Sequence, residues 1–435
     1  MLTWDRGRAS RAAIIALLAL VSFAGVVKAA PARPGDCEDI EPGRSLQQAL
    51  DDLPSNGSLC LAAGRHEGPL VIRGAQRVWG APGAWIHSNG KGSTITIEGS
   101  RAALLGIGVD GSGGRFDLLD AAVRVTGDDV RVEGVMIRDA LFGILVEQAR
   151  GAVIRTNVIS GMPDKPLGMR GDGIRLWEVK DSLVEGNLVE DSRDMVVWYA
   201  SRNRFVANRV VRGRYGAHFM YSHDNIVEGN EFIDDVVGIF AMYSRGLRVH
   251  DNLLARAHGA AGMGLGAKES GNLDLVGNRF VGNTTGIYLD TSPLDPRDHN
   301  RFEDNHVRFC GTGIVFHGRA KGNEFHANSF RDNRAQVRIE GRGDALDATW
   351  QGNDFDDYVG YDLDGDGFGD LPYELRSLSG ELTARTPQLA YFRGMPALAM
   401  VEVVGRAVPL LQPRTLVVDP RPRMRPPTRD QRDAN

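Results

Sequence analysis

The feature that most constrains this chain is an internal repeat in its central part. A short apolar strand followed by a turn asparagine recurs, and successive copies are 21 to 30 residues apart, at Asn157, Asn187, Asn208, Asn230, Asn252, Asn278, Asn305, Asn328 and Asn353. That period suits one coil of a β-helix and is too short for most helical-pair repeats. Asparagine tolerates the left-handed backbone conformation and can turn a corner between two strands, and stacked asparagines can hydrogen-bond from coil to coil. We therefore expect an all-β fold, a single-stranded right-handed parallel β-helix of about ten stacked coils.

A second strand repeats within the same coils and begins at a fixed position, glycine in all copies but one. The copies start at Gly143, Gly173, Asp194, Gly216, Gly238, Gly262, Gly286 and Gly313. Side chains alternate between the two faces of a strand, so the second and fourth residues should point inward. The predicted interior residues include Ile174, Leu176, Met195, Val197, Ala217, Phe219, Ile239, Ala241, Ile287, Leu289, Ile314 and Phe316.

The outward positions of this second strand carry an unusual set of residues. The fifth position is occupied in turn by Glu147, Trp177, Trp198, Met220, Met242, Gly266, Asp290 and His317. The third position is occupied by Leu145, Arg175, Val196, His218, Phe240, Gly264, Tyr288 and Val315. Adjacent coils lie ~4.8 Å apart, so Trp177, Trp198, His218, Met220 and Met242 should form one continuous patch, with Tyr199, Tyr221 and Tyr243 at the nearby corner.

Three interpretations of this patch remain open. It can dock a protein partner, because Trp, Tyr, Met and Arg dominate binding hot spots. His218, Met220 and Met242 can instead hold a soft metal, because thioether and imidazole ligands suit Cu(I). Alternatively, the strand register is shifted by one residue and these side chains are core, because such a slip exchanges the two faces of a strand.

A second candidate site lies in the segment YDLDGDGFGDLPY. Asp362, Asp364, Asp366 and Asp370 occupy calcium-loop positions one, three, five and nine, and Gly367 allows the sharp turn. Tyr373 stands at position twelve, where a bidentate glutamate is expected. The pattern predicts a calcium site, and the alternative is an acidic turn held by its glycines alone.

The N-terminus predicts export. Arg6, Arg8 and Arg11 precede an unbroken apolar run from residue 12 to residue 27, and small or apolar residues follow, so residues 1–29 are expected to be a cleaved signal peptide. The alternative, a membrane anchor, is less favoured because a spanning helix needs ~20 apolar residues. Without residues 1–29 the chain has 47 basic and 55 acidic side chains, a net charge of −8, and no basic stretch interleaved with aromatics. No nucleic-acid partner is expected.

The remaining organisation follows from composition. We expect an N-terminal cap over residues 30–64 with a helix at residues 45–53, the β-helix over 65–353, an acidic closing segment over 354–385, and a docking segment with a Pro/Arg-rich tail over 386–435. Residues 389–411 have the pattern of an amphipathic helix, which could pack on the end of the solenoid or dock onto a membrane partner. Cys37 and Cys60 flank the first helix, and an exported chain permits their disulfide without requiring it. Cys310 is expected to be a small buried apolar residue.

Enzymatic motifs are not evident in the sequence. Tandem carboxylates such as Asp234 and Asp235 on a strand point to opposite faces, and no outward cluster of carboxylates across coils appears, as glycoside hydrolysis would need. We expect a protein that is not an enzyme. The alternative is a carbohydrate-active β-helix: a lyase, hydrolase or epimerase.

Several stretches resemble the NosD family. They are GDGIRLWEVKDSLVEGN, RDMVVWYASRNRF, RGRYGAHFMYSHDN, GIFAMYSR, DDYVGYDLDGDGFGDLPY and LVVDPRPRMRPP, which together span most of residues 165–425. The resemblance implies a pectin-lyase-like solenoid in the periplasm, associated with a membrane ABC transporter made of an ATPase and a permease. It also implies a role, with a copper chaperone, in assembling the copper–sulfur cluster of nitrous-oxide reductase. It carries over no ligand set.

Overall fold

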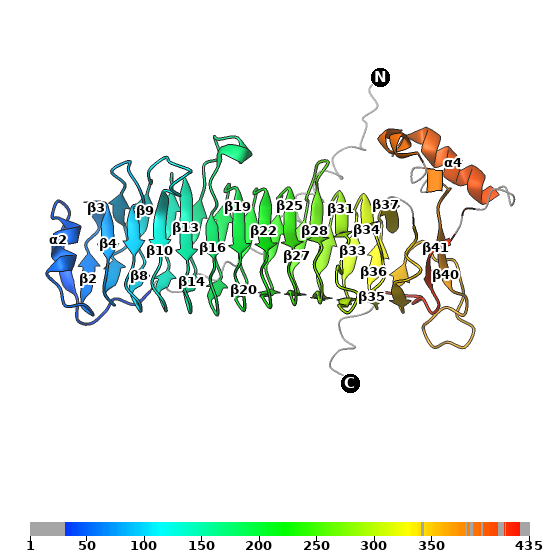
Figure 1. The fold of residues 1–435 in the computed structure, drawn as a ribbon, viewed down its shortest axis with the longest axis horizontal. Coiled ribbons are helices and arrows are strands. Elements are labelled where there is room, and N and C mark those ends of the chain that lie inside the picture. The colour runs from blue at the N-terminus through cyan, green and yellow to red at the C-terminus, as the bar shows by residue number, and fades with distance from the viewer. Residues whose placement is uncertain are drawn as a thin grey trace, which may run out of the picture. The chain divides into compact units, whose positions relative to one another are not determined.

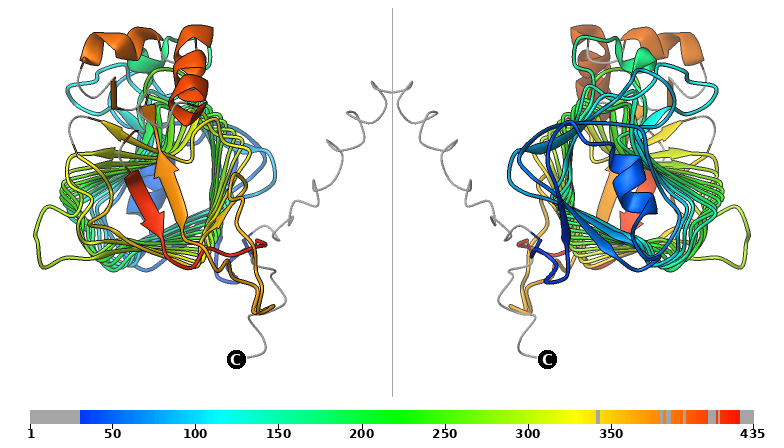
Figure 2. Two further views of the ribbon diagram at one scale, coloured as in Figure 1. Left: turned by 90° about the vertical axis from the view of Figure 1, so that its right-hand side faces the viewer. Right: turned by 90° about the vertical axis from the view of Figure 1, so that its left-hand side faces the viewer.

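The fold is a β-solenoid built from three parallel sheets. The computed structural model describes residues 31–340, 343–378, 381–382, 386–392, 395–407, 413 and 415–426. Each complete coil contributes one strand to each sheet, and like strands of successive coils pair in parallel. Figure 1 shows the strands side by side, and Figure 2 shows the three-sided cross-section. The expected all-β parallel solenoid is confirmed.

Sheet A has 14 strands among the described residues. They are β1 (Glu38–Ile40), β2 (Ser58–Leu61), β5 (Arg77–Gly80), β8 (Ala103–Leu105), β11 (Arg131–Glu133), β14 (Val153–Arg155), β17 (Leu183–Glu185), β20 (Arg204–Val206), β23 (Ile226–Glu228), β26 (Arg248–His250), β29 (Asp274–Val276), β32 (Asn300–Glu303), β35 (Asn323–His326) and β38 (Thr349–Gln351).

Sheet B has 13 strands in the same described ranges. They are β3 (Gly64–Glu67), β6 (Ala84–His87), β9 (Gly108–Asp110), β12 (Met136–Arg138), β15 (Val158–Ser160), β18 (Leu188–Glu190), β21 (Arg209–Val211), β24 (Glu231–Ile233), β27 (Leu253–Ala255), β30 (Arg279–Val281), β33 (His306–Arg308), β36 (Ser329–Arg331) and β39 (Asp354–Phe355).

Sheet C, which carries the predicted patch, has 12 strands in the described part of the chain. They are β4 (Leu70–Ile72), β7 (Ile95–Ile97), β10 (Ala121–Val125), β13 (Phe142–Glu147), β16 (Ile174–Trp177), β19 (Asp194–Trp198), β22 (Tyr215–Met220), β25 (Val237–Met242), β28 (Met263–Lys268), β31 (Thr285–Asp290), β34 (Thr312–His317) and β37 (Val337–Glu340).

The interior of the solenoid is filled by alternate residues of every strand. Every interior residue predicted for sheet C is at most 1% exposed. Phenylalanines fill much of the interior of the later coils, where the rings of Phe302 and Phe325 stack with their centroids 4.6 Å apart. The hydrophobic alternation therefore fixes which face of each strand is inside, because a slip of one residue would place these side chains in water.

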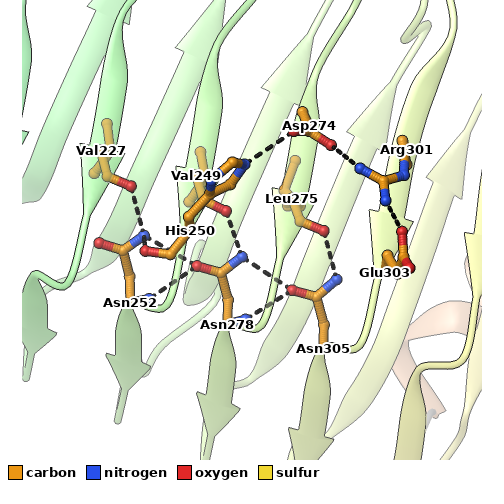
Figure 3. A network of polar contacts seen from close by, with 10 residues as sticks. All are labelled: Val227, Val249, His250, Asn252, Asp274, Leu275, Asn278, Arg301, Glu303 and Asn305. Carbon is orange, nitrogen blue, oxygen red and sulfur yellow. Dashed lines mark hydrogen bonds and ion pairs between the residues drawn. The ribbon is translucent and has the colours of Figure 1, made fainter. Parts of the chain in front are cut away.

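The asparagines between sheets A and B form a continuous hydrogen-bonded ladder (Figure 3). The Nδ2 of Asn278 donates to the carbonyl of Val249 in the preceding coil and to Oδ1 of Asn305 in the next one. Its own Oδ1 accepts from the backbone N–H and from Nδ2 of Asn252. The asparagines are fully buried, so each one satisfies backbone groups at a corner that water does not reach.

The number of coils is larger than expected, because the first coils lack this asparagine. Among the described residues 14 strands stack in sheet A, whereas the repeat predicted about ten coils. Strand register places Val135, Ile107 and Ala84 at the positions equivalent to Asn157. All three are buried, so an aliphatic row replaces the asparagine ladder in the N-terminal coils. A search for turn asparagines misses coils of this kind.

The N-terminal end contains a short helix and a disulfide. Helix α2 (Leu46–Asp51) begins after Ser45, whose side chain accepts from the backbone N–H of Gln48, and it buries Leu46, Ala49 and Leu50. Figure 2 shows this helix across the open end of the first coils. Cys37 and Cys60 form a disulfide, which settles the pairing that the sequence left open. Cys310 is free and buried as expected, and burial raises the pKa of its thiol to about 11.

A strand from the C-terminal part of the chain ends the asparagine ladder. Strand β40 (Tyr373–Arg376) pairs antiparallel with β41 (Thr415–Asp419), so segments on both sides of residue 385 share one sheet. The buried carboxylate of Asp419 accepts from the backbone N–H and Nδ2 of Asn353, both at 2.9 Å. Between these strands lie the 3-10 helix η2 (Pro387–Phe392) and helix α4 (Pro396–Ala407), and another 3-10 helix, η1 (Leu167–Met169), lies in a loop before β16.

The structure bears on export and membrane insertion only for the described residues. The signal peptide predicted at residues 1–29 lies outside the described residues. Within the described residues, no helix combines the length and the hydropathy that crossing a bilayer requires.

Asn278→Ala tests the ladder. The substitution leaves the carbonyl of Val249 and the backbone N–H of Asn252 buried without these partners. Because an orphaned buried group costs about 1–3 kcal/mol, we expect a loss of roughly 3 kcal/mol in the free energy of unfolding, measured by urea denaturation. Asn56→Ala, in an exposed turn, is the control and should change the midpoint little. Equal midpoints for the two variants would contradict a stabilising ladder.

Candidate functional site

The predicted patch lies on the outer face of sheet C. Register pairs Trp177 with Trp198, Trp198 with Met220, and Met220 with Met242 in directly adjacent strands. All four side chains are partly exposed, whereas their neighbours Val197 and Phe219 are completely buried inside. The register-slip interpretation is therefore wrong, and we call Trp177, Trp198, Met220 and Met242, together with His218, the aromatic–methionine stripe.

The third position of the same strands points outward but is largely covered by the stripe. Arg175 is only 8% exposed and lies between two indole rings, with its guanidinium carbon 5.1 Å from the centroid of Trp177 and 4.9 Å from that of Trp198. Its Nη1 donates to the buried Asp172, 3.1 Å away. The outer face of sheet C thus has an ordered layer of side chains, and cation–π contacts contribute to it.

His218 is the centre of this layer. Its Nδ1 lies 3.4 Å from the indole Nε1 of Trp198, and its Nε2 lies 3.3 Å from the sulfur of Met242. The indole N–H can only donate, so Nδ1 accepts and Nε2 carries the proton in this arrangement. The ring of Tyr215 is 4.8 Å away, and burial lowers the pKa of His218 to about 4. His218 is therefore a neutral imidazole at neutral pH.

The structure brings the predicted stripe residues together to different degrees. Trp198, His218 and Met242 are in direct contact, and Trp177 joins them through its ring, 5.7 Å from that of Trp198. Met220 lies between Trp198 and Met242 in the column of the sheet. The residues form one site in space, as the spacing predicted.

Tyr215 is a part of this site that the sequence pattern missed. Strict alternation places the residue before Gly216 inside the solenoid, but the register of β19 and β22 shifts between Asp194 and Val196. This irregularity leaves Tyr215 on the outer side, where its ring stacks on that of Phe240 at 5.7 Å. A bulge leaves no mark in the apolar alternation, so only the structure reveals it.

The C-terminal limit of the stripe differs from the prediction. Gly266, expected at the fifth position, is paired with Phe240 and therefore occupies the third, and Lys268 is paired with Met242 at the fifth. The strand repeat begins at Gly264 and not at Gly262. Two glycines separated by one residue give the same alternation, so the pattern could not distinguish them. The stripe thus ends at a lysine.

Three tyrosines continue the aromatic surface around the corner after sheet C. The rings of Tyr199 and Tyr221 are nearly parallel with their centroids 5.4 Å apart, and those of Tyr221 and Tyr243 are 4.9 Å apart. Tyr199 also contacts Trp177 at 5.3 Å. The surface therefore extends from the stripe onto the corner, as the positions of these residues in the repeat suggested.

The acidic loop at residues 362–370 is held by its own backbone. Oxygens of Asp362, Asp364 and Asp366 lie within 4.8 Å of one another, but Asp370 is not in this group. Asp362 accepts from the N–H groups of Gly365 and Gly367, and Asp366 from that of Phe368. Asp370 accepts from the N–H of Leu363, and Arg421 pairs with Asp366. Three of the four predicted calcium ligands are close together, in a loop whose backbone N–H groups donate hydrogen bonds to them.

Comparison with known proteins identifies the family. A family model described as "Periplasmic copper-binding protein (NosD)" matches residues 162–360. A protein named "Probable ABC transporter binding protein NosD" from Pseudomonas aeruginosa is 30% identical over 416 residues, which cover 88% of this chain and 93% of that protein. This chain belongs to the NosD family. A protein of the same name from Stutzerimonas stutzeri is 26% identical over 433 residues, covering 94% of this chain and 93% of the relative.

Solved structures share the fold of this NosD family member. The A-module of a mannuronan C-5 epimerase from Azotobacter vinelandii aligns with a TM-score of 0.53 and 14% identity, covering 72% of this chain and 95% of the module. The catalytic domain of a GH87 α-1,3-glucanase aligns with a TM-score of 0.51 and 14% identity, covering 74% of this chain and 69% of that chain. At this identity the likeness concerns the fold alone.

His218→Gln tests the neutral imidazole. Because the pKa of His218 is lower in the folded protein than the ordinary value of 6.5, the unfolded chain binds a proton that the folded one does not, and stability falls as the pH drops from about 6.5 to about 4. The free energy of unfolding should therefore fall less between pH 7 and pH 4.5 in His218→Gln than in the wild type. We expect the difference to be up to about 3 kcal/mol, measured by denaturation at both pH values. The exposed His258→Gln is the control. An unchanged acid-side loss in His218→Gln would show that the imidazole titrates normally.

Proposed function

We propose that this chain is a periplasmic accessory protein for the maturation of nitrous-oxide reductase. In this role it supports assembly of the copper–sulfur cluster together with a membrane ABC transporter and a copper chaperone. The proposal rests on family membership and on the names given to the family and its relatives, which mention copper binding, the periplasm and an ABC transporter. The disulfide between Cys37 and Cys60 supports an oxidising compartment, as does the export signal expected at residues 1–29.

The contact between His218 and Met242 is the observation that carries the proposed link to copper. A neutral imidazole and a thioether are ligands that suit Cu(I), and here Nε2 and the sulfur are 3.3 Å apart on an outward-facing, partly covered surface. Met220 offers a second sulfur in the same column. The donor set therefore fits copper as a transient cargo. Copper binding through Nε2 would need the other tautomer, with the proton on Nδ1, so the metal would have to displace the contact between Nδ1 and the indole N–H of Trp198.

The remainder of the stripe is proposed to bind the protein that gives or receives the metal. Trp177, Trp198 and the tyrosine corner form a contiguous aromatic surface, and aromatic residues dominate interface hot spots. A copper chaperone or the reductase docked there would lie directly over His218. Docking and copper contact involve different side chains of the same surface, so substitutions can test each of them separately.

The C-terminal segment, residues 386–435, is proposed to dock onto the transporter. Tyr391, Met400 and Val403, on η2 and α4, are 88%, 67% and 66% exposed. An apolar helix surface exposed in this way suits a groove on a membrane partner. In the same scheme, residues 30–64 form an N-terminal cap that contains α2 and the first two strands of sheet A, residues 65–353 carry most of the solenoid, and residues 354–385 close it.

The alternative function, a carbohydrate-active enzyme, has weaker support. The buried carboxylates on the side of sheet C, Asp172 and Asp194, are paired with Arg193 and Arg214 and do not line an open cleft. The solved relatives that are enzymes share only the fold. Calcium is no part of the proposed function, and the carboxylate of Asp362 binds backbone N–H groups of its own loop.

Copper binding is tested with methionine variants that keep side-chain volume. We expect Met242→Leu combined with His218→Gln to weaken Cu(I) binding at least tenfold, measured by competition with a chromophoric Cu(I) chelator. Met136→Leu, on the outer side of sheet B, is the matched control. In cells, Met220→Ala with Met242→Ala should leave folding intact and lower the copper content of the reductase. Unchanged Cu(I) affinity and reductase copper content would remove the stripe from the proposal.

Transporter docking is tested at the exposed apolar positions of α4. We expect Met400→Glu with Val403→Glu to abolish co-purification with the ABC transporter, because two carboxylates cannot enter an apolar groove without large desolvation cost. Val359→Glu is the control, since Val359 is 96% exposed and lies outside the segment. Normal co-purification of the double variant would refute docking through α4 and leave the copper test unaffected.

A further inference from the structure

The corner between sheets B and C has a second column of polar residues. Asn283 follows Phe280 by three residues, and its Oδ1 accepts from the backbone N–H of Ala257 at 2.9 Å while its Nδ2 donates to the carbonyl of Leu254. Asn333 repeats this arrangement with the N–H of Cys310 and the carbonyl of Val307. In both coils the asparagine accepts from one backbone group and donates to another in the preceding coil.

Asp235 occupies the equivalent position in an earlier coil. It follows Phe232 by three residues, and Phe232, Leu254, Phe280 and Val307 are aligned in adjacent strands. Its Oδ1 accepts from the N–H of Gly213 at 2.6 Å, as the asparagine oxygens do. Asp235 is 1% exposed, and its Oδ2 is buried without a hydrogen-bond partner. Oδ2 therefore stands where an asparagine would carry its donor.

We propose that Asp235 is a protonated carboxylic acid in the folded protein and acts as a member of this column, donating its Oδ2 proton to the carbonyl of Val210. Val210 is aligned with Phe232 in the preceding coil, so its carbonyl corresponds to the acceptors of Asn283 and Asn333. A carboxylate could only accept at this place, whereas the acid supplies one acceptor and one donor, like the asparagine amide.

The charged groups around Asp235 are paired with one another. Asp234 is bound by Arg256, Arg212 pairs with Asp191, and Asp194 pairs with Arg214. Burial is the main cause that raises the pKa of Asp235 well above its usual value. The hydrogen bond from Gly213 and the charge of Arg212 lower it in part, and the carboxylates of Asp234 and Asp194 raise it further. The chain thus has a buried acid with no counterion.

The position of Asp235 links its protonation to the strand that carries His218. A side chain at Gly216 would approach Oδ2 of Asp235 to 2.8 Å, so the carboxyl group packs directly against β22. A charge on Asp235 would seek water that this corner does not admit. We therefore expect alkaline pH to loosen this coil before its neighbours.

The test compares the pH dependence of stability for the wild type, Asp235→Asn and Asp234→Asn. A pKa raised in the folded state means that the unfolded chain, whose carboxyl has a pKa near 4, has lost a proton that the folded chain retains, so wild-type stability falls as the pH rises above 4. Asp235→Asn should abolish this fall. The unfolding constants of wild type and variant should diverge by up to about tenfold per pH unit until the folded-state pKa is passed, measured by urea denaturation from pH 5 to pH 9.

Two further variants keep the outcome decisive. Asp234→Asn, at the exposed neighbouring carboxylate, should retain the wild-type slope, and Asn283→Asp should acquire a new one. Infrared spectroscopy at neutral pH should detect a carboxylic-acid carbonyl band in the wild type that is missing in Asp235→Asn. Parallel pH profiles for the wild type and Asp235→Asn, or no such band, would show that Asp235 is ionised and overturn the proposal.

Discussion

The hydrogen bond between one coil and the next is the interaction on which the rest of this structure depends. A three-residue strand such as β14 or β17 has little stability alone, and each coil exposes two edges that only its neighbours can satisfy. The asparagine ladder also hydrogen-bonds one coil to the next, at the corner between sheets A and B, where backbone groups would otherwise be buried without partners. Its last asparagine, Asn353, is satisfied by Asp419 from the C-terminal part of the chain. Register is then shared along the stack, and this puts side chains from four separate coils into one column.

The stripe on sheet C is a consequence of that register. Trp177, Trp198, Met220 and Met242 lie at least 21 residues apart in sequence. They become neighbours because they are paired directly in adjacent strands, and the irregularity between β19 and β22 lies before these positions. Their packing then creates an environment in which His218 remains neutral and in contact with a thioether sulfur. A rigid parallel sheet is a suitable support for such a site, because neither a loop nor a conformational change is needed to assemble it.

Much of this could be predicted from the sequence, for a physical reason. The interior positions from Ile174 to Phe316 follow from alternation, since one face of each strand must avoid water, and the outward stripe follows from the same count. The irregularity at Asp194 that exposes Tyr215 could not be predicted, because a bulge changes the backbone and not the apolar pattern. The start of the strand repeat at Gly264 could not be predicted either, because Gly262 fits the same alternation. The early coils were missed because Val135 and Ile107 replace asparagine. The contact of Asp419 with Asn353 was missed because the two residues are far apart in the sequence and no local pattern connects them.

Aliphatic residues replace the asparagine ladder in the early coils, and this affects which substitutions the corner positions tolerate. An amide in the row from Asn157 to Asn353 must match a donor and an acceptor on each side, so a change at one member disturbs its neighbours. Val135 and Ile107 only fill volume, and a buried aliphatic side chain tolerates exchange for another of similar size. Among homologues, the corner should therefore vary freely before residue 157 and stay nearly fixed beyond it, which makes the boundary visible in any set of related sequences.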